Sequence, residues 1–462
     1  MALCYHSRSG VHQMSAVTRR QFLAAAGIAA AGPVPVNAAA NPDFDVIIIG
    51  AGAAGISAAR RIARSGKTFA VLEAGDRWGG RCFTDLKTFG VPYDQGAHWV
   101  CDTEAFPVDQ LASKAGLETY KEPPTERLRV AIPAEPRFRV PPRTAHVSEL
   151  EEFYSKLVSC NQAIASAGPS DISCASALPK DMGDWRPTME FVLGPFRSGN
   201  DLSAMSANEY ALWVKPENSL RVRQGVGTLM GRLALGAPIR FFSPVNRIEW
   251  GSRLVQVETR GERMTARAVI LTASTAVLAS GKIEFRPSLP AHFAEAIGKL
   301  ALGSLDRVAI EFSGNPLGVK SDELIFEKAL GRQTAALHAN FLGSKLCLVQ
   351  VGGKMCADLA QEGEAALNDF AISWLVGQFG SDLRNSIERT HVTRWSKHPW
   401  TLGAFSTALP GGQSARKALS KPLGDQVWFA GEAVHESLWG TVAGAWETGD
   451  RAANDVISRI RN

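Results

Sequence analysis

Several features that often reveal a protein's class are missing from this chain of 462 residues. Its 50 lysines and arginines nearly balance 45 aspartates and glutamates, so it lacks the basic excess typical of nucleic-acid-binding proteins. Its seven cysteines form no CxxC pair and no Cys/His spacing suited to a metal site, so we expect no metal and scattered buried thiols rather than disulfides. No internal repeat or low-complexity tract is present, and the composition is that of an ordinary soluble globular protein.

The first 40 residues have the features of an export signal rather than of a folded domain. Two arginines in Thr18–Leu23 precede the apolar stretch Leu23–Ala31, and small residues at Asn37–Ala40 offer cleavage sites. This pattern resembles a twin-arginine signal peptide over 1–40, and the apolar stretch falls far short of the ~20 residues of a membrane anchor. We therefore expect the twin-arginine export machinery to carry the folded protein to the periplasm. Met14 would place the arginines nearer to a start codon.

A glycine-rich turn between a strand and a helix opens the folded part of the chain. The β-branched run Asp45–Ile49 predicts a strand, and Ala54–Arg64 predicts a helix. Between them lie Gly50, Gly52 and Gly55 in GxGxxG spacing. The first glycine permits the tight turn, the second lets the backbone approach a pyrophosphate, and the third lets the helix pack close to the strand. The pyrophosphate would lie at the helix N-terminus, where unpaired N–H groups and the dipole favour anions.

Two following segments support a dinucleotide site. Thr68–Leu72 predicts a second strand, and Glu73 stands after it, where an acidic residue accepts hydrogen bonds from an adenosine ribose. The glycine-rich loop Ala74–Arg81 then brings two arginines, which can add charge and donors to the same pyrophosphate. On these residues alone, NAD would fit as well as FAD.

The chain leaves this nucleotide-binding pattern twice and returns to it. A loop-rich section with many prolines covers 102–218, and a second section of different character covers 287–389. The further predicted elements are strands at 238–249, 253–259, Arg267–Ala273, Arg307–Phe312, Lys345–Val351 and near Val427, and helices at Glu362–Phe379 and Gly440–Arg459. The predicted fold is α/β, with a Rossmann-like cofactor domain (44–101, 219–286 and 390–462) and an interleaved α+β substrate-binding domain (102–218 and 287–389).

With the motifs in this order, the chain resembles the flavin-containing amine oxidases, the group of monoamine, polyamine and L-amino-acid oxidases. The resemblance extends from residue 44 to the end. It rests on Gly50–Gly55 with Glu73, Trp78–Arg81, Asp94–Trp99, Ser243–Ile248, Trp395, Gly403–Ser406 and Phe429–Glu432. The resemblance implies FAD, because segments from distant parts of the chain would surround one elongated cofactor.

The resemblance also assigns roles in binding FAD. It places the phosphates over Gly52, Ala53 and Arg81, the ribose on Glu73, and the adenine near the backbone of Val245. At the other end, Glu432 would hydrogen-bond the ribityl chain, and the dipole of the helix opened by Val442 would stabilise negative charge on the flavin. The expected FAD-binding residues are Gly50, Gly52, Ala53, Gly55, Glu73, Ala74, Gly80, Arg81, Ala97, His98, Trp99, Val245, Trp395, Gly431, Glu432 and Val442.

Three details resemble the polyamine oxidases within the family. Gly96–Trp99 is similar to their Gly-Ala-His-Trp, Gly431–His435 is similar to their Gly-Glu-Ala-x-His, and Thr441 replaces a tyrosine of the monoamine oxidase aromatic cage. Phe405 would be the remaining aromatic wall. His98 would hydrogen-bond a substrate nitrogen or help to keep an amine neutral, with a pKa that its surroundings move across working pH.

Two departures from the family pattern affect the chemistry. Arg307 aligns with the family lysine that holds a water near the flavin, and a guanidinium is bulkier and does not lose its proton. We therefore expect slow reaction with oxygen. Ala404 replaces the cysteine that tethers FAD in monoamine oxidases, and no membrane tail follows Ile457–Asn462, so we expect non-covalent FAD and no membrane anchor.

The resemblance implies oxidation of an aliphatic amine to an imine, which is hydrolysed to an aldehyde and an amine. Polyamines or acetylated polyamines are the leading substrates, and O2 or a periplasmic cytochrome c or copper protein would reoxidise the flavin. The expected catalytic residues are His98, Arg307, Phe405 and Thr441. Three alternatives stay open: an L-amino acid or other secondary amine as substrate, C–C desaturation as in related FAD desaturases, and a flavoprotein scaffold. An amino acid would require a cavity arginine, for which Arg307 is a candidate.

Overall fold

The strand before the glycine-rich turn lies at the centre of a parallel arrangement. In the computed structural model, which describes residues 41–121, 128–133, 142–213 and 218–460, β1 (Phe44–Ile49) pairs in parallel with β2 (Phe69–Leu72) and β13 (Arg263–Leu271). Val46–Ile49 are buried, as expected of a strand covered on both faces. The predicted signal peptide at 1–40 lies outside the described residues.

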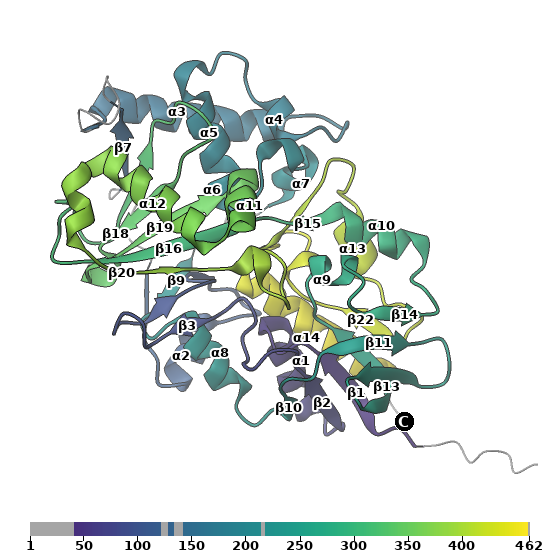
Figure 1. Ribbon diagram of the computed structural model, residues 1–462. Coiled ribbons are helices and arrows are strands. Elements are labelled where there is room, and N and C mark those ends of the chain that lie inside the picture. The colour runs from purple at the N-terminus through teal and green to yellow at the C-terminus, as the bar shows by residue number, and fades with distance from the viewer. Residues whose placement is uncertain (1–40, 122–127, 134–141, 214–217, 461–462) are drawn as a thin grey trace, which may run out of the picture. The chain divides into compact units, whose positions relative to one another are not determined.

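Within the described residues this nucleotide sheet has eight strands, in the order β10–β2–β1–β13–β12–β11–β14, with β22 pairing with β13. The other strands are β10 (Ile239–Arg240), β11 (Val245–Glu249), β12 (Val255–Thr259), β14 (Glu284–Arg286) and β22 (Val427–Phe429). Two helices pack together against it, α1 (Ala53–Arg64) and α14 (Val442–Arg459) (Figure 1). Their contact is close at Gly449, where a Cβ would lie 2.1 Å from the Ala54 carbonyl oxygen.

The second large sheet has helices on both faces (Figure 1). Among the described residues its order is β20–β16–β19–β18–β17–β7–β8. These strands are β7 (Leu128–Ile132), β8 (Arg143–Thr144), β16 (Leu305–Phe312), β17 (Glu323–Glu327), β18 (Ala336–Ala339), β19 (Leu346–Gly352) and β20 (Ile387–Val392). One core joins this sheet to α11 (Gly353–Glu362) and α12 (Glu364–Phe379), and another joins it to α3 (Val147–Ala165) and α5 (Arg186–Leu193).

Small sheets and short helices connect the two large sheets. β5 (Val100–Cys101), β9 (Ser219–Val222) and β6 (Thr119–Lys121) form one small sheet, while β15 (Leu300–Leu302) pairs with β21 (Ser406–Ala408) and β3 (Thr84–Asp85) with β4 (Tyr93–Asp94). The remaining α-helices are α2 (Val108–Lys114), α4 (Cys174–Ala177), α6 (Pro195–Ser198), α7 (Ala207–Leu212), α8 (Val226–Ala234), α9 (Thr275–Ala279), α10 (Ala291–Lys299) and α13 (Ala415–Leu419). The predicted domain boundary between 389 and 390 lies inside β20.

The helix expected near Glu362–Phe379 is confirmed as α12 (Glu364–Phe379). Gly363, with a φ of +117°, separates it from α11, whose last residue is Glu362. Two other predicted elements differ from the observed ones. The strand expected at 238–249 is divided into β10 and β11 by a turn in which Phe242 has a φ of +54°. The last helix begins at Val442 rather than at Gly440, because Thr441 caps it.

Two expectations from composition concern cysteines and membrane spans. Cys82, Cys160, Cys174, Cys347 and Cys356 are buried free thiols. In the part of the chain that the structure describes, no helix combines the length and apolarity that crossing a membrane requires.

Candidate functional site

One continuous cavity of about 1980 Å³ extends from the glycine-rich turn to the second sheet. Pockets for small ligands commonly measure about 300–1,000 Å³, so this cavity has room for a dinucleotide and a substrate together. Nearly all of the predicted site residues line it. The exception is Gly55, which lies behind the turn.

The three motif glycines have distinct structural duties. Gly50 has a φ of +100°, which favours glycine. A Cβ on Gly55 would lie 1.9 Å from the Gly50 carbonyl oxygen, so the turn tolerates no side chain there. Around Gly52 the space is open, because the nearest atom to a Cβ would be the Gly79 carbonyl oxygen at 4.0 Å. Gly52 is the N-cap of α1, and no side chain caps the helix. The turn therefore presents backbone donors to the cavity, which suits a pyrophosphate.

Glu73 is held in place at the end of β2. Its two carboxylate oxygens accept hydrogen bonds from the backbone N–H groups of Ala51, at 2.7 Å, and Gly75, at 2.8 Å. A carboxylate has further lone pairs, so both oxygens can still accept hydrogen bonds from ribose hydroxyls. Val245, the first residue of β11, lines the same end of the cavity. The donor and acceptor set at this end fits the adenosine half of FAD.

Arg81 and Glu432, predicted to contact different parts of FAD, form an ion pair with a distance of 2.8 Å. Glu432 also accepts hydrogen bonds from the Ser406 hydroxyl, at 2.7 Å, and from the Gly440 N–H, at 2.9 Å. Burial opposes ionisation of Glu432, but the charges of Arg81 and Arg416 outweigh this effect and keep the pKa of its carboxyl below the ordinary value. Glu432 is therefore an ionised, rigidly held acceptor beside the cavity.

The segment 96–99 packs against both the glycine-rich loop and Trp395. The Trp395 indole N–H donates to the Gln95 carbonyl at 2.9 Å, and the Ala97 N–H donates to the Arg81 carbonyl at 3.1 Å. A Cβ on Gly96 would lie 1.9 Å from the Arg81 carbonyl oxygen, so this contact requires glycine. These bonds bring Ala97, His98 and Trp99 to the cavity wall.

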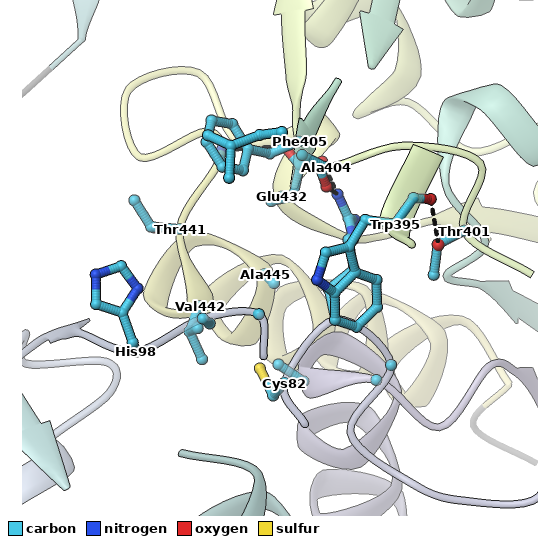
Figure 2. Close-up of a pocket in the computed structure, with 18 of the residues that line it drawn as sticks. Cys82, His98, Trp395, Thr401, Ala404, Phe405, Glu432, Thr441, Val442 and Ala445 are labelled. Carbon is cyan, nitrogen blue, oxygen red and sulfur yellow. Dashed lines mark hydrogen bonds and ion pairs between the residues drawn. The ribbon is translucent and has the colours of Figure 1, made fainter. Parts of the chain in front are cut away.

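Phe405, Thr441 and His98 lie around the N-terminal end of α14 (Figure 2). Phe405 approaches Gly440, where a Cβ would meet its ring at 3.4 Å. The Thr441 hydroxyl accepts a hydrogen bond from the Gly444 N–H at 2.9 Å and donates one to the Leu438 carbonyl at 2.7 Å. Thr441 therefore caps α14, a duty that the motif comparison did not predict.

Arg307 determines the tautomer of His98 and helps to keep it neutral. One guanidinium nitrogen lies 2.7 Å from His98 Nδ1, and arginine has no acceptor, so Nδ1 accepts and the proton of the neutral imidazole is on Nε2. Burial lowers the pKa of His98 well below its ordinary value, and the charges of Arg307 and Arg221 lower it further. The suggestion that His98 titrates near working pH is therefore wrong: it stays neutral there, because its surroundings disfavour the imidazolium.

The remaining bonds of Arg307 are also made inside the protein. Another guanidinium nitrogen donates to the Gly96 and Asp94 carbonyls, at 3.0 and 3.3 Å. The Nε–H group donates to the Gln350 side-chain oxygen at 3.4 Å. The nitrogen that contacts His98 donates to the same oxygen, at 3.5 Å, through its second N–H. Arg307 is 6% exposed. It consequently has no donor left for a substrate carboxylate.

One group of side chains that lines the cavity was not predicted from the sequence; it consists of the aromatic residues Trp213, Trp439 and Tyr210 and the cation Arg197. The rings of Trp439 and Trp213 are 6.4 Å apart, and the Arg197 guanidinium lies 4.8 Å from the centre of the Trp213 ring. Arg197 also donates to the Tyr210 hydroxyl at 2.6 Å. All four side chains line the cavity. They belong to no recognisable motif, so no local signal pointed to them.

Among the described residues, no group of three or more His, Cys, Asp or Glu side chains could hold a metal ion. The site is thus formed from a dinucleotide cradle, an ionised glutamate, a neutral histidine beside an arginine, and an aromatic wall.

Comparisons with known proteins identify the family of the chain. The model of the family described as "Flavin containing amine oxidoreductase" matches residues 53–457. Polyamine oxidase 3 of Oryza sativa subsp. japonica is 26% identical over 447 residues, which cover 90% of this chain and 89% of the relative. Lysine-specific histone demethylase 2 of Homo sapiens is 27% identical over 443 residues, and this chain spans only 53% of it.

Solved structures show the same fold. Cyclohexylamine oxidase from Brevibacterium oxydans IH-35A has a TM-score of 0.74 at 22% identity, with 91% of this chain and all of that chain covered. Wild-type putrescine oxidase bound to putrescine has a TM-score of 0.73 at 20% identity, with 90% and 99% covered. The chain therefore belongs to the flavin-containing amine oxidoreductase family, as an FAD-dependent amine oxidase or dehydrogenase.

Proposed function

We propose that this protein oxidises an aliphatic amine to an imine, which water hydrolyses to an aldehyde and an amine. The observation that carries the proposal is the single cavity that joins the dinucleotide cradle to Phe405, Thr441 and His98. FAD supplies the redox chemistry when bound, by accepting a hydride equivalent from the α-carbon of the amine. The chain's own residues orient the amine and exclude water.

The charges near His98 support binding of the neutral form of the amine. His98 is neutral, and the positive guanidinium of Arg307 lies 2.7 Å from it. A positive charge nearby disfavours a second one, so an ammonium group would lose its proton more readily here than in water. Phe405 contributes an apolar wall that favours the same neutral form.

A polyamine or acetylated polyamine is favoured by the sequence motifs and by the names of two relatives, a polyamine oxidase and a putrescine oxidase. Outside the nucleotide end, and apart from Glu432, which pairs with Arg81, the cavity is lined by the acids Asp102, Asp109 and Asp322 and by the cations Lys121, Arg197, Arg221 and Arg307. The support for polyamines therefore comes from motifs and relatives rather than from the charges of the cavity.

The amine class is tested by mixing the FAD-loaded protein without oxygen with polyamines, monoamines and amino acids, and following the loss of flavin absorbance. Reduction by at least one aliphatic amine is expected. Failure of every amine, together with reduction by a polyene or porphyrinogen, would replace the proposal by C–C desaturation.

We also propose that the twin-arginine signal at 1–40 directs export to the periplasm, where a cytochrome c or a small copper protein reoxidises the flavin faster than O2 does. Arg307 supports the second part, because it stands at the position of the family lysine. Stopped-flow reoxidation by O2 and by such a carrier measures the two rates. Rapid formation of hydrogen peroxide would contradict it, and retention of a tagged protein in the cytoplasm would contradict export.

A further inference from the structure

Arg197 is a cation on the cavity wall that has no acidic partner among the described residues. It is half-buried in the four-residue helix α6. One of its N–H groups donates to the Tyr210 hydroxyl, and within the described ranges the others meet no acceptor. The Tyr210 hydroxyl in turn donates to the Asn161 side-chain oxygen at 2.8 Å, so this network fixes the guanidinium without neutralising it.

The position of Arg197 suits an anion rather than an amine. A guanidinium presents donors in a planar fork that matches a carboxylate, and it repels an ammonium group. Trp213 supports one face of the fork through a cation–π contact at 4.8 Å. The site is therefore preorganised for a carboxylate.

A series of aromatic contacts links Arg197 to the region of Phe405. Trp213 contacts both Arg197 and Trp439, and Trp439 directly precedes Gly440, which contacts Phe405. Arg307, the arginine nearer to His98, has all of its N–H groups directed at protein acceptors. A carboxylate on the α-carbon would thus find no free donor on Arg307, whereas one at the far end of an alkyl chain would reach Arg197.

We propose that the amine oxidised by this protein carries a carboxylate at the end remote from the oxidised carbon, and that Arg197 binds this carboxylate. The proposal rests on the amine oxidation proposed above and names a substrate class that differs from the polyamines, which only motifs and relatives favour. The aromatic wall of Trp439 and Trp213 would cover the alkyl chain between the two ends.

The test compares compounds of equal carbon number with the FAD-loaded protein in the absence of oxygen. The six-carbon series is ε-aminocaproate, n-hexylamine, hexamethylenediamine and norleucine, and a four-carbon series of γ-aminobutyrate, n-butylamine and putrescine probes chain length. In at least one of the two series, we expect the ω-amino acid (ε-aminocaproate or γ-aminobutyrate) to reduce the flavin at a lower concentration than the other compounds of that series. Arg197→Gln should raise the half-saturating concentration of that compound by about 10–100-fold and leave that of the alkylamine unchanged.

A control and a second readout separate this proposal from the general amine oxidation. Arg186→Gln removes a half-buried arginine at the start of the neighbouring α5, which pairs with Glu190, and should change neither value. Caproate, which has no amine to oxidise, should bind to wild type in calorimetric titration and lose its binding in Arg197→Gln.

Several results would overturn the carboxylate assignment. Preference for the diamine or for norleucine would do so, as would an Arg197→Gln variant that loses affinity for all amines equally, because the arginine would then only support the wall. If no amine reduces the flavin but caproate binding still depends on Arg197, the oxidation proposal fails and the anion site stands.

Discussion

The two ends of the cavity are formed in different ways. At the nucleotide end, backbone groups form most of the site. They are the Gly50–Gly52 turn, the N-terminus of α1, and the N–H groups that hold Glu73, all within about 30 residues of sequence. At the amine end, side chains arrive from distant elements, with Arg197 on α6, Arg307 on β16 and Phe405 before β21. Substitutions should therefore have large, local effects at the first end and graded, separable effects at the second.

The largest expected effect is at the nucleotide end, with Gly55→Ala. The added Cβ would lie 1.9 Å from the Gly50 carbonyl oxygen, so α1 would have to move away from the turn. We expect the purified protein to lose its bound flavin, measured by absorbance after desalting, and to melt at a lower temperature.

The matched control is Gly298→Ala in α10. No atom lies within 4 Å of its added Cβ, and a helical alanine is more stable than glycine by about 0.5–1 kcal/mol. This variant should keep its flavin and be slightly more stable. Equal flavin content in both variants would show that the turn is not under steric constraint.

The contrast also explains what could be predicted from the sequence. The strands β1 and β2, helix α1, the steric roles of Gly50 and Gly55, and the position of Glu73 after β2 follow from residues whose spacing along the chain fixes their spacing in the fold. The meeting of Arg307 with His98 could not be predicted, because it depends on how β16 packs against the segment 96–99. Arg197 and Trp213 belong to no motif, so only the tertiary structure brings them together.

An intermediate effect is expected at the amine end from replacing Arg307. Burial is the main cause of the low pKa of His98, and the charge of Arg307 is the next. Arg307→Gln removes this charge, so the pKa of His98 should rise towards its ordinary value of 6.5. Arg307→Lys retains the charge and should keep the pKa low. The pH dependence of anaerobic flavin reduction by an alkylamine checks both variants.

The sign of this pH effect follows from the neutral state of His98. In wild type the imidazole is uncharged throughout the neutral range, so its protonation does not limit the rate there. In Arg307→Gln, falling pH would protonate a larger fraction of His98, and the rate should fall at a higher pH than in wild type. Arg223→Gln, an exposed arginine paired with Glu118, provides the control. Identical profiles for all four proteins would show that Arg307 does not control His98.

The smallest expected effect is at Thr441, which lies where the two ends meet. Its hydroxyl caps α14 through the Gly444 N–H, and loss of such a cap costs about 1 kcal/mol. Thr441→Ala should therefore melt at a lower temperature, and Thr441→Ser should restore wild-type stability because serine keeps the capping oxygen. The kinetics then separate capping from substrate contact. If Thr441 only caps the helix, Thr441→Ser has the wild-type KM for an alkylamine. If the lost methyl group formed part of the amine wall beside Phe405, Thr441→Ser raises the KM while its melting temperature stays at the wild-type value.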